Sequence, residues 1–528
     1  MEITLNPQSS GGGESIELNP KRLKIWLEGL PVLNPVESLN RILVAVRGLT
    51  DLSMGNKKRL PLLNLYRDRA NAIFHAFDST SFMTNLRSAT ERELVSEHIL
   101  ELHQQLAAGY ERVARRRLKK GGTLRGSNTL RSALYGAMEQ HTHALLHTFR
   151  IYGPLQANTQ WKINRAYSLA EKHKLLMEPV MMGNRPARYE NISLLFRRVN
   201  LLCVCDPFRF PEGEAVRVFD YLERYAAVCR IKKGLPDKNR EGQFLIALDS
   251  NYPPVYPGRM ECVEKTKTPR VLDVMPAVRL AVRDQLNEAV SPRHKIHAEQ
   301  GHRLLEHLIP LFRAARSRNE ERASATHTVH LAQGFDAIGY FLRNDRGHLR
   351  EAARHRTAAT AELRAAASAT EVPHLLYPWT VTDESKRGYR LSAPGKAAAP
   401  KIGDLVGVLV NRGKNAPELR LSAVRWSRKT ADDDIHVGVE NIATDRSLPG
   451  EMTMRPRGEP PSVAGCIYLP EPVTKAPHGS IIAPAEAYRP GANGVLIPEV
   501  GREISFSTGV VLMQTARLVQ FALQAVRD

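Results

Sequence analysis

Residues 382–391 of this 528-residue chain read TDESKRGYRL, and the residues on both sides alternate between polar and apolar. Such alternation is typical of half-buried β-strands, and a glycine such as Gly388 suits the turn between two of them. A bare turn needs only the glycine, yet Asp383 and Ser385 stand just before it. The stretch therefore indicates a β-hairpin that carries an acid, a hydroxyl and a glycine where one strand ends and the next begins.

Other strand-like runs surround this hairpin from about residue 323 onward. They read THTVHLAQGF, YPWTVTD, GYRLSA, DLVGVLVN, LRLSAVRWSRK and IHVGVENI. Several short strands joined by short turns predict a small antiparallel barrel or sandwich. Residues 446–528 contain further strand-like runs, which either extend this β-structure or form a second barrel.

The first part of the chain has helical periodicity instead. From Thr90 to Leu118, apolar residues recur at steps of three and four, and the segment ends in the basic sequence RVARRRLKKGG. Similar patterns recur from about residue 21 to 240, so a large all-α domain is expected there. The predicted fold class is α+β multidomain, with an N-terminal all-α domain followed by an antiparallel β-barrel and a C-terminal β extension.

Changes in composition predict the domain boundaries. Serine and glycine near the N-terminus indicate a flexible tail, and the alanine- and arginine-rich residues 343–371 indicate an insertion in the barrel. The predicted parts are a tail (1–20), an α-helical domain (21–240), a connector with a strand and helices (241–312), a β-barrel (313–445) and a C-terminal β-rich extension (446–528).

Composition narrows the class of protein. The five cysteines are scattered without CxxC spacing, which argues against a disulfide framework or a zinc ribbon. No apolar run is long enough for a membrane span, and the first residues lack the apolar core of a secretory signal. We therefore expect cytoplasmic localisation without membrane insertion. The net charge of +20 invites an anionic partner, although a solvated basic surface explains charge equally well.

Two groups of histidines are candidate metal sites. His141, His143 and His147 lie in one predicted helix, and His143 and His147 have the i, i+4 spacing of residues that share a metal. Ala144, however, stands where the acid of an HExxH motif would follow His143. The second group is loose and consists of His294, His297, His302 and His307. Neither group predicts a metal site, and because the sequence has no nucleophile elbow, Walker loop or Rossmann turn, we expect neither a catalytic residue nor a cofactor.

Paired arginines precede the first strand of the predicted barrel. Arg318 and Arg322 are four residues apart in SRNEERAS. Guanidinium groups bind phosphate and guanine O6 and N7, and they stack on purines. A carboxylate such as Asp383 accepts hydrogen bonds from adjacent N–H groups, which the Watson–Crick edge of guanine presents. Together these residues favour a ligand with guanine bases and phosphates.

The order RxxxR, then DxSxxG within β-structure, resembles the PilZ domain family of bacterial cyclic di-GMP receptors. The segments VRW at residues 424–426 and HVGVE at residues 436–440 are also similar to that family, and the resemblance covers about residues 313–445. It implies that Arg318 and Arg322 clamp guanine and phosphate, that Asp383 and Ser385 bind a guanine edge, and that Gly388 leaves room for the base.

The resemblance implies a bacterial signalling effector in which cyclic di-GMP alters the arrangement of the barrel and the helical domain, with a protein partner reached through the helices. Two points stay open. Arg350 and Arg354 repeat the arginine spacing and become the better clamp if residues 343–371 are not a loop of the barrel. The alternative function is a basic helical scaffold or nucleic-acid-binding protein whose barrel only docks.

Overall fold

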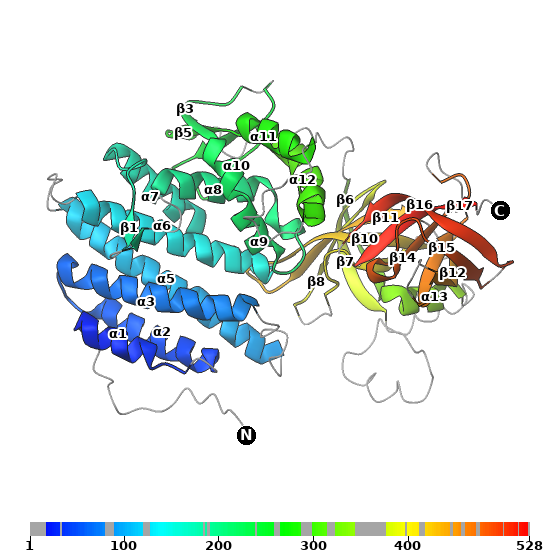
Figure 1. Ribbon diagram of the computed structural model, residues 1–528, viewed down its shortest axis with the longest axis horizontal. Coiled ribbons are helices and arrows are strands. Elements are labelled where there is room, and N and C mark those ends of the chain that lie inside the picture. Colours follow the sequence, from blue (N-terminus) through cyan, green and yellow to red (C-terminus); the bar gives the residue numbers. More distant parts are fainter. Residues whose placement is uncertain are drawn as a thin grey trace. The chain divides into compact units, whose positions relative to one another are not determined.

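The structure is a computed structural model, and its elements fall into two compact units (Figure 1). The helical unit comprises Met1–Ile151, Leu155–Pro207 and Gly213–Ser317, and the barrel unit comprises Tyr152–Pro154, Phe208–Glu212 and Arg318–Asp528. The residues that the structure describes are 17–31, 34–79, 89–119, 127–182, 185–186, 191–237, 240–257, 265–286, 298–313, 323–343, 376–395, 399–410, 418–443, 447–455, 460–470, 476–499, 501–515 and 517–525.

The helical unit is built around two long helices that pack along each other, α5 and α6 (Figure 1). Its described helices are α1 (Pro20–Glu28), α2 (Pro35–Asp51), α3 (Asn56–Ser79), α5 (Ala89–Lys119), α6 (Ser127–Arg150), α7 (Thr159–Lys172), α8 (Ile192–Val204), α9 (Glu214–Tyr221), α10 (Glu223–Val228), α11 (Met275–Leu286) and α12 (Ala298–Arg313). The predicted periodicity of residues 90–118 corresponds to α5, whose Leu102, Leu106 and Tyr110 are fully buried.

A small sheet belongs to the helical unit as well. It has the antiparallel order β3 (Arg230–Lys233), β5 (Pro269–Asp273) and β4 (Gln243–Ala247). A two-stranded pair, β1 (Met181–Met182) and β2 (Arg185–Pro186), lies elsewhere in the unit. Residues 241–312, predicted as a connector, thus cluster with the helices in the structure, and a division of the chain at residue 313 remains a proposal.

The first barrel is closed and wholly antiparallel. Its strands are β6 (Ala323–Gln333), β7 (Tyr377–Ser385), β8 (Gly388–Ala393), β9 (Leu405–Val410), β10 (Glu418–Lys429) and β11 (Ile435–Ala443), in the spatial order β10-β11-β8-β7-β6-β9. Alternate residues of these strands point inward, where Trp379 and Tyr389 are the largest side chains of the core. A barrel leaves no unpaired sheet edge, which the closure of β9 on β10 achieves here.

The C-terminal β-rich region forms a second closed barrel. Its strands are β12 (Leu448–Arg455), β13 (Ser462–Leu469), β14 (Ser480–Pro484), β15 (Asn493–Pro498), β16 (Ile504–Gln514) and β17 (Leu518–Ala525), in the order β12-β13-β14-β17-β16-β15. Its interior holds Phe506 and Phe521, both almost fully buried. Of the two alternatives left open by the sequence, the second barrel is the one observed.

The two barrels share an apolar core with a helix that the sequence analysis missed. Helix α13 (Gly334–Arg343) directly follows β6 and supplies Ile338 and Phe341, which pack with Leu419 of the first barrel and Ile482 of the second. The sequence predicted a strand through Phe335, but the helical spacing of the apolar residues that follow places them on one face. The predicted insertion at residues 343–371 lies outside the described residues beyond Arg343.

The α+β multidomain fold class is confirmed, with helices in the N-terminal part and two six-stranded antiparallel barrels in the C-terminal part. Among the helices that the structure describes, none combines the length and the apolar character needed to cross a membrane.

Candidate functional site

Residues 382–391 form the end of β7 and the start of β8, which are joined as a hairpin by the two-residue loop Lys386 and Arg387. Its register pairs Asp383 with Arg390 and Ser385 with Gly388. Directly opposite residues of an antiparallel pair lie on the same face of the sheet. The two strands therefore bring the acid, the hydroxyl, the glycine and one further arginine together.

A β-bulge decides which face these residues occupy. Val381 pairs with Leu391, and both point into the barrel core, so strict alternation would turn Asp383 inward too. The register shift between Val381 and Asp383 leaves Thr382 as an extra residue, and Thr382 Oγ1 donates to the carbonyl of Arg390 at 3.3 Å. Because a bulge re-aims the side chains beyond it, Asp383 and Ser385 lie on the outward face.

Gly388 has a structural role at this position. A Cβ atom built there would lie 1.9 Å from the carbonyl oxygen of Val439, because β11 approaches β8 closely. No side chain fits within that distance while β8 and β11 stay paired as they are. The glycine is therefore required by strand pairing inside the barrel, whatever its part in ligand binding.

The outward face continues across β11 to β10. Gly438 of β11 pairs with Arg390 on one side and with Trp426 on the other. A Cβ atom at Gly438 would lie 1.9 Å from Trp426 Nε1, so the indole ring covers the glycine. The Arg390 guanidinium carbon lies 5.9 Å from the centre of the Trp426 ring, within the range of a cation–π interaction.

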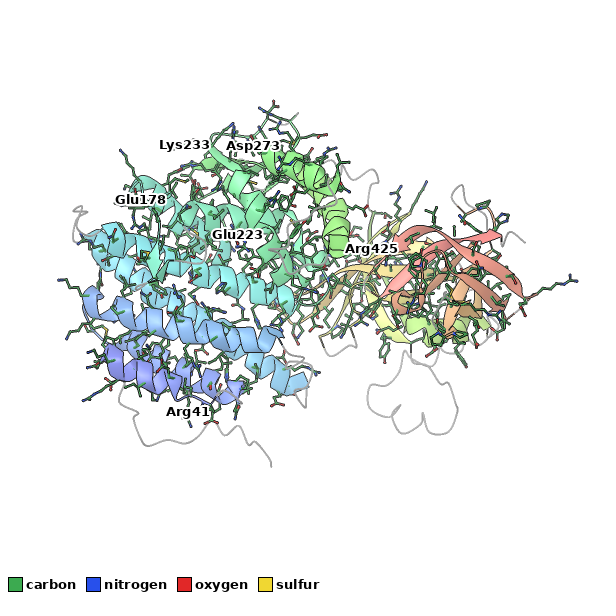
Figure 2. All side chains as sticks on the ribbon, in the orientation of Figure 1. Arg41, Glu178, Glu223, Lys233, Asp273 and Arg425 are labelled. Atoms are coloured by element: carbon green, nitrogen blue, oxygen red, sulfur yellow. The ribbon has the colours of Figure 1, made fainter. Side chains whose placement is uncertain are left out.

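A second bulge orients Trp426. Val424 pairs with Val439 inside the barrel, and the shift between Val424 and Trp426 leaves Arg425 as the extra residue. Arg425, which Figure 2 labels, donates from Nε to Glu440 Oε2 at 2.7 Å. The indole of Trp426, half-buried, thus faces outward beside the hairpin rather than into the core.

His436 completes this face. Its Nδ1 accepts a hydrogen bond from Arg390 Nη2 at 3.0 Å, since an arginine can only donate. Burial lowers the pKa of His436, and repulsion by Arg390 and Arg428 lowers it further. The neutral His436 ring therefore positions Arg390 through this hydrogen bond and leaves the positive charge of Arg390 available to an anion. We call Asp383, Ser385, Arg390, Trp426 and His436 the hairpin face.

The predicted arginine clamps lie outside the described residues: Arg318, Arg322, Arg350 and Arg354 are all in segments that the structure does not describe. The described chain resumes at Ala323, which pairs with Glu384, and Ser324 pairs with Asp383. The chain thus enters the barrel at the strand position next to the hairpin face, and Ala323 follows Arg322 directly in the sequence.

Three members of the hairpin face were not predicted from the sequence: Arg390, Trp426 and His436. Trp426 and His436 lie in the two segments quoted for their family resemblance, but no role was assigned to either. Alternation along GYRLSA gave a signal for Arg390, whose neighbours Tyr389 and Leu391 are buried. The two bulges leave no comparable signal in the sequence, because they depend on pairing with distant strands.

Two of the candidate metal-binding histidines, His141 and His147, have clear surroundings in the helical unit. His141 Nε2 lies 2.7 Å from Glu111 Oε1, and His147 is a buried residue of α6. Of the second group, His294 and His297 lie outside the described residues. Within the part of the chain that the structure describes, no three His, Cys, Asp or Glu side chains gather closely enough to hold a metal ion.

The protein thus has an N-terminal helical region followed by two antiparallel barrels, and the first barrel has an outward face with polar and aromatic side chains. Residues 21–237, most of which belong to the helical unit, match the family model described as the N-terminal domain of the cyclic-di-GMP receptor FimW. The resemblance found in the sequence covers only about residues 313–445 and does not include this part of the chain.

One curated protein is similar to this chain over most of the length of both. The chain is 21% identical over 536 aligned positions to the cyclic-di-GMP receptor FimW of Pseudomonas aeruginosa, and the alignment covers 90% of this chain and 86% of that protein. The similarity therefore extends across the helical region and both barrels.

Proposed function

We propose that this protein is a cyclic di-GMP-binding signalling effector whose ligand binds at the hairpin face of a PilZ-like first barrel. The similarity to a cyclic-di-GMP receptor over 90% of the chain supports the ligand. The strand register supports the location of the site. Asp383 and Ser385 share the outward face, and β6 begins beside them at Ala323, the residue after Arg322.

The chemistry of the face suits a guanine ring. The carboxylate of Asp383 accepts from the adjacent N–H groups of the guanine Watson–Crick edge, and the hydroxyl of Ser385 bonds a further edge atom. Ser385 Oγ is only weakly engaged at present, at 3.5 Å from the carbonyl oxygen of Gly388. Trp426 offers a ring for stacking, and Arg390 adds positive charge toward the phosphates.

The register also favours one of the two arginine pairs. Arg322 directly precedes Ala323, whose partner in the neighbouring strand is Glu384. Arg350 and Arg354 instead follow α13, the helix that packs between the two barrels. We therefore assign the clamp to Arg318 and Arg322, as a proposal.

The proposed mechanism is binding without catalysis. Two phosphates neutralise the arginines, which close on the hairpin face, and the closed state alters how the helical unit and a protein partner respond. Such a switch operates only to the extent that the ligand binds one arrangement more tightly than the other. We propose as well that the protein is located in the cytoplasm, where it would encounter cyclic di-GMP.

Calorimetric titration of the full-length protein tests the proposal. We expect saturable binding of cyclic di-GMP and no comparable binding of GTP or cyclic di-AMP. Arg322→Ala and Asp383→Ala each remove a charge-assisted hydrogen bond and should weaken binding about ten- to a hundredfold.

Two matched variants serve as controls. Asp432→Ala removes the same charge from the exposed turn between β10 and β11 and should leave the affinity unchanged. Arg350→Ala tests the other arginine pair and should also bind normally. Unchanged cyclic di-GMP affinity in both Arg322→Ala and Asp383→Ala would show that the site assignment is wrong.

A further inference from the structure

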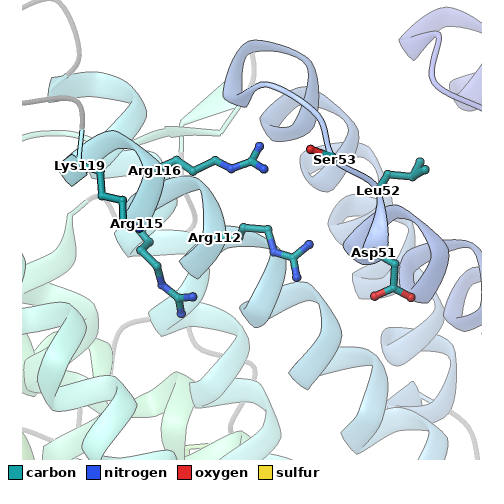
Figure 3. A pocket seen from close by; sticks show the side chains of 7 residues that line it. All are labelled: Asp51, Leu52, Ser53, Arg112, Arg115, Arg116 and Lys119. Carbon is teal, nitrogen blue, oxygen red and sulfur yellow. The ribbon is translucent and has the colours of Figure 1, made fainter.

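The helical unit contains a basic pocket that the proposed function does not use. It lies between the C-terminal part of α5 and the turn after α2, with a volume of about 260 Å³ (Figure 3). Its lining residues, which define the basic pocket, are Asp51, Leu52, Ser53, Arg112, Arg115, Arg116 and Lys119. All of them belong to the helical unit.

Four of these side chains are cations from one face of one helix. Arg112, Arg115, Arg116 and Lys119 follow each other along α5 at the three- and four-residue spacing of neighbours on a helix surface. Asp51 is the one acid that lines the pocket, so the lining carries a net charge of +3 from four cations and one anion. Figure 3 shows the Arg112 and Arg116 side chains extending toward the turn that contains Ser53.

The last turn of α2 and the turn after it hold two of the cations in place. A helix leaves its last carbonyl groups without partners, and here Arg112 Nη1 donates to the carbonyl of Thr50 in the last turn of α2. Arg116 Nη1 donates to the carbonyl of Met54, in the turn after α2. The basic tract at the end of α5 thus reaches beyond its own helix, because Arg112 caps α2 and Arg116 binds the turn that follows it. Carbonyl groups are uncharged, so these bonds position the guanidinium groups without neutralising them.

A fifth cation lies close behind the pocket. Arg59 is 1% exposed and donates from Nη1 to the carbonyl of Leu49 at 2.7 Å. Burial lowers the pKa of Arg59, and repulsion by Arg112 and Arg116 lowers it further. The cations therefore repel one another, and an anion bound among them would relieve that repulsion.

We propose that the basic pocket binds a phosphate group, supplied either as inorganic phosphate or as the monoester of a small phosphorylated molecule, at a site separate from the hairpin face. Guanidinium groups fork onto phosphate oxygens, and pre-ordered donors lose little freedom on binding. Pockets for whole drug-sized ligands span about 300–1,000 Å³, so the smaller basic pocket suits a single phosphate group rather than a complete dinucleotide.

Titration of the full-length protein with sodium phosphate tests this site, with thermal unfolding and calorimetry as readouts and sodium chloride at matched ionic strength as the reference. The informative variant is Arg115→Gln/Lys119→Gln, because both side chains are exposed and neither caps α2. We expect its phosphate affinity to fall about tenfold or more, since two of four cations are lost. Arg117→Gln removes a charge one residue away, outside the pocket lining, and should keep the wild-type affinity.

Further arms separate the sources of the phosphate group. Tighter binding of adenosine monophosphate than of inorganic phosphate would identify a phosphomonoester ligand, and the reverse order would identify the free ion. Cyclic di-GMP affinity should be unchanged in Arg115→Gln/Lys119→Gln, which keeps this test independent of the hairpin face. Equal phosphate affinity in wild type and the double variant, stabilisation by chloride alone, or binding only of duplex DNA with a steep salt dependence would each overturn the proposal.

Discussion

At the scale of single residues, Thr382 and Arg425 determine what the first barrel presents to solvent. Each is the extra residue of a bulge, and each bulge turns the following side chain from the core to the outward face. Asp383 and Trp426 would otherwise point into a core that already contains Trp379. A carboxylate buried there without a partner would cost several kcal/mol, so the bulges are what makes a polar hairpin compatible with an apolar barrel.

Substitution of Gly388 should damage the barrel rather than the ligand contacts alone. In Gly388→Ala the new methyl group meets the carbonyl of Val439, and β8 and β11 must separate. We expect a loss of about 1–3 kcal/mol in the free energy of unfolding of the barrel unit, measured by urea denaturation.

Gly465→Ala is the matched control, because nothing lies within 4 Å of a Cβ atom at that position. It should change stability by less than about 0.5 kcal/mol. Wild-type stability in Gly388→Ala would mean that β8 and β11 are not as close as described. A loss of cyclic di-GMP binding in that variant, on the other hand, would not by itself assign Gly388 to the ligand.

At the scale of elements, α5 and α6 bury histidines at their contact. His103 Nδ1 lies 2.9 Å from Gln140 Oε1, and the His103 and His143 rings are 5.5 Å apart. His147 Nε2 is buried without a hydrogen-bond partner among the described residues. Burial lowers the pKa of His103 to about 4 and that of His147 to about 3. Both side chains are therefore neutral in the folded helical unit.

Acid should destabilise the helical unit for this reason. In the unfolded chain a histidine has a pKa of about 6.5, so below that pH the unfolded state binds protons that the folded state does not. The free energy of unfolding therefore falls as the pH drops below about 6.5, and at pH 5 each buried histidine costs on the order of 2 kcal/mol. Calorimetric scans of the full chain from pH 7.5 to 5 should show the helical transition moving to lower temperature.

His147→Leu should make that transition less sensitive to pH, because leucine cannot be protonated and also removes the unpaired nitrogen. The control is His478→Leu, whose side chain is exposed in the barrel unit and should leave the helical transition as it is. An identical pH dependence in wild type and His147→Leu would contradict the assignment of the acid effect to this contact.

At the scale of the whole molecule, the chain divides into a helical unit and a barrel unit, and within the latter the two barrels are joined by an apolar core. Leu419 from the first barrel and Leu518 from the second are both nearly inaccessible to water in this core. Because α13 contributes to the same cluster, neither barrel would keep its apolar surface covered alone. We therefore expect the barrels to unfold together.

Leu518→Ala should consequently destabilise the first barrel as well as the second, by about 2–5 kcal/mol for a buried leucine. The second barrel contains no tryptophan. In a Trp26→Phe/Trp161→Phe background, the fluorescence of Trp379 and Trp426 reports on the first barrel alone, and its urea transition should shift to lower concentration.

Val463→Ala provides the comparison, since that side chain is 61% exposed on the second barrel and contributes to no shared core. Its transition should coincide with that of the parent. A Leu518→Ala transition that also coincides with the parent would show that the barrels unfold independently.

The sequence by itself determined those features that depend on neighbours along the chain. The three- and four-residue periodicity predicted α5, the alternation predicted β7 and β8, and the glycine after an acid and a hydroxyl predicted the hairpin between them. Helix α13 was missed because its short apolar pattern follows a strand without a polar break. Residues that act through local spacing, such as Asp383 and Ser385, could be proposed from sequence.

Only the tertiary structure decided which distant residues share a face. The bulges at Thr382 and Arg425 and the approach of Arg112 to the end of α2 follow from pairing and packing across tens of residues. Such contacts form only when burial and hydrogen bonding in the complete fold offset the entropy lost by closing the intervening chain. No local sequence pattern shows whether they do. Arg390, Trp426 and His436 therefore joined the hairpin face, and the basic pocket emerged, only once the strands and helices were in place.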